Sequence, residues 1–253
     1  MNHPDRDPID EIVTFSSMGL DFVDFTMEPP CASSWRIDAK AIRKCLDDHG
    51  MSAVGHTAFY LPLASAFDGL RSAAVDELKR CMDQFAVIGA PWMNIHPDPR
   101  APFHARRFVM SRNIESIREL IDHGRDLGVR VMVENIPAGF NRAADLSMLL
   151  DPIPELGLHL DIGHCNLDVE ENSTGEILER YGNRLAHLHL HDNNGGHADL
   201  HLPLGVGVID VKKELGFVKR AGYDGTITLE VFAPDKHFLQ YSRDRLKEFW
   251  DAA

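Results

Sequence analysis

The chain has 253 residues, of which 44% are hydrophobic and 26% charged, as in ordinary globular domains. Its net charge of −13 argues against broad non-specific binding of nucleic acid, although a local basic rim stays compatible with it. We find no bilayer-length apolar run, no signal peptide and no CxxC pair among the four cysteines, and therefore expect no membrane contact and a cytoplasmic location.

Helical and strand-like patterns alternate along the chain. The predicted helices cover residues 8–19, 36–49, 68–89, 111–127, 143–150, 175–181, 210–221 and 235–249. The predicted strands cover residues 21–28, 51–57, 91–96, 129–135, 155–161, 184–191 and 225–232. This order predicts an α/β fold, a TIM (β/α)8-type barrel built as a single domain over residues 1–253, with a doubly wound open sheet as the competing architecture.

The first strand of such a barrel is missing from the pattern. A strand should precede the helix at 8–19, yet residues 1–7 are polar and flanked by proline. Either the first strand is truncated, or the barrel has seven strands and a gap. An open sheet edge would be a natural place for a partner, so a homo-oligomer is among the expected assemblies.

Polar residues stand at the C-terminal ends of the predicted strands. Side chains alternate along a strand, so Leu188 and Leu190 occupy the opposite face from His187, His189 and His191. The residues at the strand ends are His56, His96, Glu134, Asp161, His189 and Glu230. Barrel enzymes build their sites at these ends, and buried carboxylates without a counter-ion would be costly. We therefore predict a divalent cation there.

The stretch from His187 to His201 is also rich in potential ligands, with five histidines and two aspartates. Imidazoles and carboxylates are the ligands that zinc and manganese take in proteins. For His159 and His187 we favour hydrogen bonding in the barrel interior, and the roles of His191 and His197 stay open. Glu28 ends the first predicted strand, where helix capping or substrate contact is as plausible as metal binding.

Several motifs together resemble the xylose-isomerase-like TIM-barrel superfamily, which contains sugar (phosphate) isomerases and epimerases and the endonuclease-IV type apurinic endonucleases. The motifs are Gly55-His-Thr-Ala-Phe-Tyr-Leu-Pro, Asn94-Ile-His-Pro, Val133-Glu-Asn, Leu160-Asp-Ile-Gly-His, His187-Leu-His-Leu-His-Asp-Asn, Asp199-Leu-His-Leu-Pro-Leu-Gly and Leu229-Glu-Val. The resemblance covers nearly the whole chain from Pro8 onward, and the missing first strand departs from it.

The two branches of this superfamily imply different site chemistry. Resemblance to the ketose epimerases implies one divalent ion held by Glu134, Asp161, His189 and Glu230, with the two glutamates as acid and base and His164 contacting substrate. Resemblance to the endonucleases implies three zinc ions. Their ligands would be His56, His96 and Glu134 for the first, Asp161, His189 and Glu230 for the second, and His164, Asp199 and His201 for the third.

The sequence shows little of the basic, intercalating loop chemistry that opens a duplex, apart from Arg100, Arg106 and Arg107 as a candidate phosphate-binding edge. Our leading hypothesis is therefore a metal-dependent isomerase or epimerase of a small sugar or sugar phosphate, using one to three zinc or manganese ions. A three-zinc endonuclease or phosphodiesterase is the alternative, and only this alternative has nucleic acid as a partner. A third hypothesis is a non-catalytic metal-binding barrel.

Overall fold

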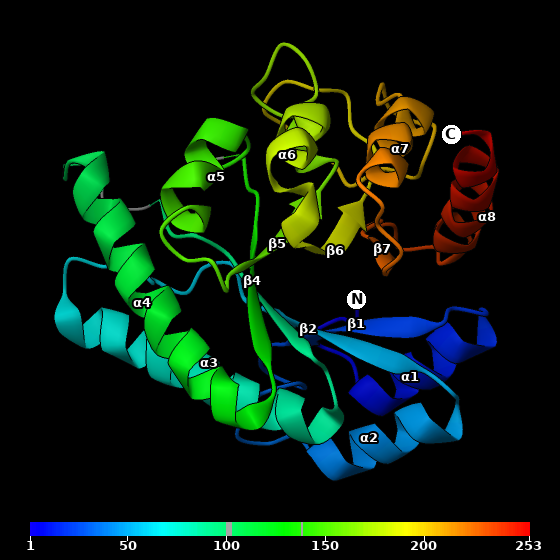
Figure 1. The fold of residues 1–253 in the computed structure, drawn as a ribbon. Helices are drawn as coiled ribbons and strands as arrows, with labels where there is room; N and C mark the ends of the chain where they lie inside the picture. The colour runs from blue at the N-terminus through cyan, green and yellow to red at the C-terminus, as the bar shows by residue number, and fades with distance from the viewer. Residues whose placement is uncertain (100–102, 138) are drawn as a thin grey trace. The chain divides into compact units, whose positions relative to one another are not determined.

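The computed structural model describes residues 1–99, 103–137 and 139–253, so Arg100 of the proposed phosphate-binding edge lies outside it (Figure 1). The chain divides into two compact units. Unit 1 contains Met1–Val133 and Leu149–Gly157, and unit 2 contains Glu134–Met148 and Leu158–Ala253. That the chain forms a single domain over residues 1–253 stays a prediction.

Unit 1 repeats a helix-and-strand pattern four times. Its elements are α1 (Pro8–Ser17), β1 (Phe22–Met27), α2 (Ala39–Asp48), β2 (Ser52–Thr57), α3 (Asp68–Ile88), β3 (Trp92–Ile95), α4 (Arg106–Leu127) and β4 (Arg130–Glu134), whose last residue belongs to unit 2. The strand pairs β1–β2, β2–β3 and β3–β4 are all parallel. Helix α2 packs between α1 and α3, and α3 packs on α4 (Figure 1). These helices bury their apolar faces, and Phe85 of α3 and Ile117 of α4 are fully buried.

Unit 2 continues the repeat. Its elements are β5 (Gly157–Asp161), whose first residue belongs to unit 1, α6 (Thr174–Tyr181), β6 (Leu185–Leu190), α7 (Val211–Arg220), β7 (Ile227–Leu229) and α8 (His237–Ala252). Unit 2 also contains most of α5 (Ala143–Leu150). The pairs β5–β6 and β6–β7 are parallel, α6 packs on α7, and α7 packs on α8 (Figure 1). The backbone N–H of Asn135, just after β4, donates to the carbonyl of His159 in β5 at 3.3 Å.

The predicted fold class is confirmed. The strands follow sequence order from β1 to β7 without a crossover, and helices separate them along the chain. That order is typical of a TIM barrel and differs from the reversal of strand order in a doubly wound sheet. Seven strands are present among the described residues, and none of them precedes α1. None of the described helices is both long and apolar enough to span a membrane.

Several element boundaries differ from the prediction, and those of α4 and β7 have a physical explanation. Helix α4 begins at Arg106, five residues before the predicted start at Ser111, because Val109 and Met110 are buried and extend its apolar face toward the N-terminus. Strand β7 contains only Ile227–Leu229, although the alternating pattern predicts 225–232. Ser111 is a residue type that often caps a helix, which explains the predicted start of α4. Burial of the apolar turn before Ser111 instead makes this helix begin earlier.

The side chain of Asn2 occupies part of the edge where a preceding strand would pair with β1. Its amide oxygen accepts from the backbone N–H of Thr26 at 2.7 Å, and its amide nitrogen donates to the carbonyl of Thr26 at 3.1 Å. Asn2 is 3% exposed. One side chain thus satisfies both backbone groups of an edge residue, as a neighbouring strand would.

Replacing this side chain tests how much the capped edge contributes. We expect Asn2→Ala to lower the free energy of unfolding by about 1–3 kcal/mol, since it leaves two buried backbone groups without partners. The measurement is urea unfolding followed by circular dichroism. His3→Ala is the matched control, because the His3 side chain is mostly exposed. Equal stability of the two variants would contradict this role of Asn2.

Candidate metal centre

Unit 2 brings together four of the predicted ligands, which we call the carboxylate cluster: Glu134, Asp161, His189 and Glu230. Glu134 ends β4 and Asp161 ends β5, while His189 lies opposite Asp161 in the β5–β6 register. The N–H of Glu230 donates to the carbonyl of Leu190 at 3.1 Å, which continues the pairing beyond β7. One ligand atom from each residue lies within 4.8 Å of the others. Strand register therefore places all four at one level.

The carboxylate cluster is buried and rich in negative charge. Glu134 is 1% exposed, Asp161 is 0% and Glu230 is 7%. The Nδ1 atom of His189 lies 3.0 Å from Glu230 Oε2 and 4.0 Å from Glu134 Oε1. Two like charges about 4 Å apart repel by about 4 kcal/mol at an effective dielectric constant of about 20. Three carboxyl groups buried together with one imidazole therefore favour a further positive charge.

Asp161 shows where that charge would sit. Its Oδ1 atom accepts from the backbone N–H groups of Gly163 at 2.7 Å and His164 at 3.1 Å. Its Oδ2 atom is buried and accepts no hydrogen bond from the residues that the structure describes. A carboxylate that is fixed through one oxygen, and that shares a cluster with two glutamates and a histidine, keeps its other oxygen for a divalent ion.

Electrostatics favours the ionised form of Asp161. Burial alone would raise its pKa, but the neighbouring His164 and His191 hold the pKa of this carboxyl well below its usual range. In His164, burial lowers the pKa and the charge of Asp161 opposes it, with a net pKa well above the usual value. Asp161 and His164 thus form a pair in which the positive charge of a protonated imidazole balances the carboxylate. A bound metal ion could supply that positive charge in place of the proton.

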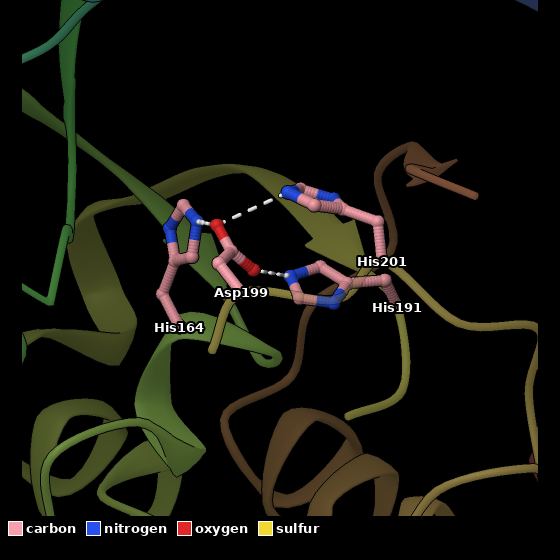
Figure 2. Close-up of side chains that lie close together, drawn as sticks. All are labelled: His164, His191, Asp199 and His201. Carbon is pink, nitrogen blue, oxygen red and sulfur yellow. Dashed lines mark hydrogen bonds and ion pairs between the residues drawn. The ribbon is translucent and has the colours of Figure 1, made fainter. Parts of the chain in front are cut away.

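Beside the carboxylate cluster lies a second group, which we call the imidazole cluster: His164, His191, Asp199 and His201 (Figure 2). The Nε2 atoms of the three histidines all face the carboxylate of Asp199. His164 Nε2 and His201 Nε2 each lie 3.1 Å from Asp199 Oδ2, and His191 Nε2 lies 3.5 Å from Asp199 Oδ1. The predicted group of His164, Asp199 and His201 thus comes together, and His191 joins it.

The loop that carries Asp199 and His201 is fixed by the buried carboxylate of Asp192. That carboxylate accepts backbone N–H groups from Asn193, Gly205, Gly207 and Ile209 at 2.9–3.1 Å. The backbone of Asp192 also forms an antiparallel bridge with Leu202. His201 itself has φ 46°, a left-handed conformation that is strained for a residue other than glycine. The loop is thus held in a shape that keeps His201 over Asp199.

The remaining candidates are His56, His96 and Glu28, all of which belong to unit 1. His56 and His96 are buried in unit 1, with ring centroids 5.1 Å apart, and their assignment to a zinc ion with Glu134 stays a prediction. Glu28 accepts a hydrogen bond from the Tyr60 hydroxyl at 2.6 Å, and this bond, with burial, raises the pKa of Tyr60 to about 12.

The two deeper histidines differ from each other. The prediction of interior hydrogen bonding is confirmed for His187, whose ring nitrogens lie 2.7 and 2.9 Å from the hydroxyls of Thr226 and Thr228. His159 instead places Nδ1 3.3 Å from Glu134 Oε2 and so supports the carboxylate cluster. Sequence reasoning missed this role. The two-residue step from His159 to Asp161 along one strand face was the signal that could have found it.

Comparison with known proteins places this geometry in a family. The model of the xylose isomerase-like TIM barrel family matches residues 14–249, nearly the whole chain. The chain belongs to this family. The described residues contain seven strands of this barrel fold.

Several known proteins resemble this chain over most of its length. A ketose 3-epimerase of Arthrobacter globiformis is 24% identical over 235 residues, which cover 85% of this chain and 74% of that protein. The structure of an L-ribulose 3-epimerase superposes with a TM-score of 0.82 at 16% identity, covering 96% of this chain and 89% of the other. The IOLI protein with a bound zinc atom superposes with a TM-score of 0.81 at 15% identity, covering 98% and 94%.

The clamp made by Asp192 can be tested directly. We expect Asp192→Asn to lower the free energy of unfolding by at least about 2 kcal/mol, because an amide nitrogen would face N–H donors in a buried place. Amide hydrogen exchange should accelerate from Asn193 to Ile209. Asp210→Asn provides the control, since Asp210 caps α7 through a single exposed bond to Lys213 N. Unchanged exchange in the loop of Asp192→Asn would refute the clamp.

Proposed function

We propose that this protein is a divalent-metal-dependent isomerase or epimerase of a small sugar or sugar phosphate. The observation that carries the proposal is the pair of buried glutamates, Glu134 and Glu230, in one cluster with Asp161 and His189. Its family relatives include epimerases of ketoses, which supports the same chemistry. The cysteines Cys31, Cys45, Cys81 and Cys165 are free, which supports the proposal of a cytoplasmic protein.

The carboxylate cluster would hold the ion. Three carboxylates and one imidazole suit manganese or zinc, and the buried Oδ2 of Asp161 supplies a ligand atom that no described hydrogen bond occupies. A bound ion would supply Lewis-acid polarisation of the substrate carbonyl. The chain keeps its ligands in place through strand register and through the two N–H bonds to Asp161 Oδ1.

The two glutamates would move the proton. Epimerisation at a carbon next to a carbonyl requires a base that removes the proton from one face and an acid that returns a proton to the other. We assign these tasks to Glu134 and Glu230, each taking either part according to the direction of the reaction. The proton leaves carbon for a carboxylate oxygen, an enediolate forms, and the other carboxylic acid protonates the same carbon. His159, 3.3 Å from Glu134, orients that carboxylate.

The role of His164 in contacting substrate stays a prediction. In the structure its Nδ1 donates to the carbonyl of Asn135 at 2.8 Å and its Nε2 faces Asp199. A substrate hydroxyl would have to compete with Asp199 for that nitrogen. We therefore assign proton transfer to Glu134 and Glu230 and not to His164.

A second candidate function is a zinc-dependent phosphodiesterase or apurinic endonuclease. The convergence of His164, Asp199 and His201 favours it, because neighbouring metal ions can activate water and stabilise both oxygens of an in-line displacement. The acidic chain disfavours it, since nucleic acid binding depends on cations that neutralise phosphates.

Replacing the proposed base tests the leading function. We expect Glu134→Gln to lower kcat on the best sugar substrate by about 10²–10⁴-fold, the range of a lost general base, while the fold is retained. Glu179→Gln, at an exposed position of α6, should keep wild-type kcat. Wild-type turnover by Glu134→Gln would remove Glu134 from the mechanism.

Parallel assays separate the two functions. We expect the metal-loaded protein to epimerise or isomerise at least one member of a panel of ketoses and their phosphates, to lose this activity on chelation, and to regain it with manganese or zinc. It should leave a duplex with an abasic site intact. Cleavage of the duplex without sugar turnover would establish the second candidate, and failure in both assays would favour a non-catalytic metal-binding barrel.

A further inference from the structure

Asn135 makes hydrogen bonds of a strand residue with its side chain. It follows Glu134 at the end of β4 and is 0% exposed, and its backbone N–H donates to the carbonyl of His159 in β5 at 3.3 Å. Regular parallel pairing would next join the Asn135 carbonyl to the N–H of Asp161. Instead, Asn135 Oδ1 accepts from that N–H at 2.7 Å. The backbone carbonyl of Asn135 is therefore released from strand pairing.

A proline makes the second bond of this side chain necessary. In a regular ladder the Asp161 carbonyl would accept from the N–H of residue 137, but that residue is Pro137, which has no N–H. Asn135 Nδ2 supplies a donor in its place, 3.0 Å from the Asp161 carbonyl. The same nitrogen donates to Cys165 Sγ at 3.3 Å. The amide thus pairs both backbone groups of Asp161, and its two polar atoms are engaged.

The released carbonyl of Asn135 holds His164. It lies 2.8 Å from His164 Nδ1, and this nitrogen is the donor because a carbonyl only accepts. With Nδ1 fixed in this way, Nε2 of the same ring lies 3.1 Å from Asp199 Oδ2 (Figure 2). One uncharged residue therefore sets both the backbone of Asp161 and the ring of His164.

The position of Asp161 depends on this support. The bonds from Gly163 and His164 to Asp161 Oδ1 fix the carboxylate within its own turn. The two bonds from the Asn135 amide tie the backbone of Asp161 to the residue after Glu134. Ligands of a metal site must be held to within about 0.5 Å. Loss of the amide would leave an N–H and a carbonyl of the buried Asp161 without these partners, so this backbone would shift.

We propose that Asn135 is a positioning residue of the carboxylate cluster. Its amide holds Asp161 at the level of Glu134, and its carbonyl orients His164, while Asn135 itself binds neither ion nor substrate. This inference rests on the proposed function, because it requires a divalent ion in the carboxylate cluster. Residues that hold a ligand in this way typically contribute about 10–100-fold to metal affinity.

The experiment measures Mn²⁺ binding to the metal-free full-length protein by isothermal titration calorimetry. Asn135→Ala removes the amide. Asn2→Ala is the matched control, because Asn2 makes the same two bonds, at 2.7 and 3.1 Å, to the backbone of Thr26. We expect both variants to lower the urea midpoint of unfolding, but only Asn135→Ala to weaken Mn²⁺ binding, by about 10–100-fold. Asp161→Ala should abolish the same binding event, which identifies the titrated site.

Wild-type Mn²⁺ affinity in Asn135→Ala would overturn the positioning role, while the proposed function would stand. An equal loss of affinity in Asn2→Ala would trace the effect to stability and would also overturn it. A wild type that binds neither Mn²⁺ nor Zn²⁺ would overturn the metal centre and the positioning role together.

If Asn135→Ala fails to fold by circular dichroism, Asn135→Asp takes its place. This variant keeps an oxygen for the N–H of Asp161 and loses the donor for its carbonyl. The added negative charge alone would tighten Mn²⁺ binding. Weaker binding by Asn135→Asp would therefore support the positioning role, and equal or tighter binding would contradict it.

Discussion

Three carboxylates buried at the C-terminal ends of β4, β5 and β7 impose the main constraint on unit 2. Glu134, Asp161 and Glu230 have ligand atoms within 4.8 Å of one another and of His189, with little exposure to solvent. Burial of like charges at this spacing is unfavourable unless a cation joins them. The parallel register of β5 and β6, the tail of β4 and the extension of β7 all serve to hold these side chains at one level.

Two histidines of the imidazole cluster form hydrogen bonds with backbone carbonyls in or next to the carboxylate cluster. The carbonyl that holds His201 belongs to Glu230, and the one that holds His164 belongs to Asn135, the residue after Glu134. Asp161 reaches both clusters, since its Oδ1 lies 3.4 Å from His191 Nε2. A shift in either cluster would therefore move the other. The strained φ of His201 and the buried clamp of Asp192 are the local costs of keeping this arrangement fixed.

Much of this architecture can be predicted from the sequence, because the strands and helices of a barrel follow local patterns along the chain. Alternation within strands predicts which residues share a face, and the parallel repeat predicts that strand ends meet, so Glu134, Asp161 and His189 could be grouped without coordinates. The sequence pattern could not predict that His191 belongs to the imidazole cluster. That membership depends on the backbone carbonyl of Asp192, on the space left by Gly163 and on a loop that folds back over 13 residues from Asp192 to Gly205. The alternating pattern also predicted too long a strand for β7, in which Ile227 and Leu229 are only partly buried.

Diffraction from crystals grown with zinc, recorded on both sides of the zinc absorption edge, tests the central claim most directly. The claim is that the buried carboxylates of unit 2 exist to hold a cation. The account predicts an anomalous peak bounded by Glu134, Asp161, His189 and Glu230, with ligand distances of about 2.0–2.2 Å. Zinc elsewhere in the crystal and none between these four side chains would contradict it.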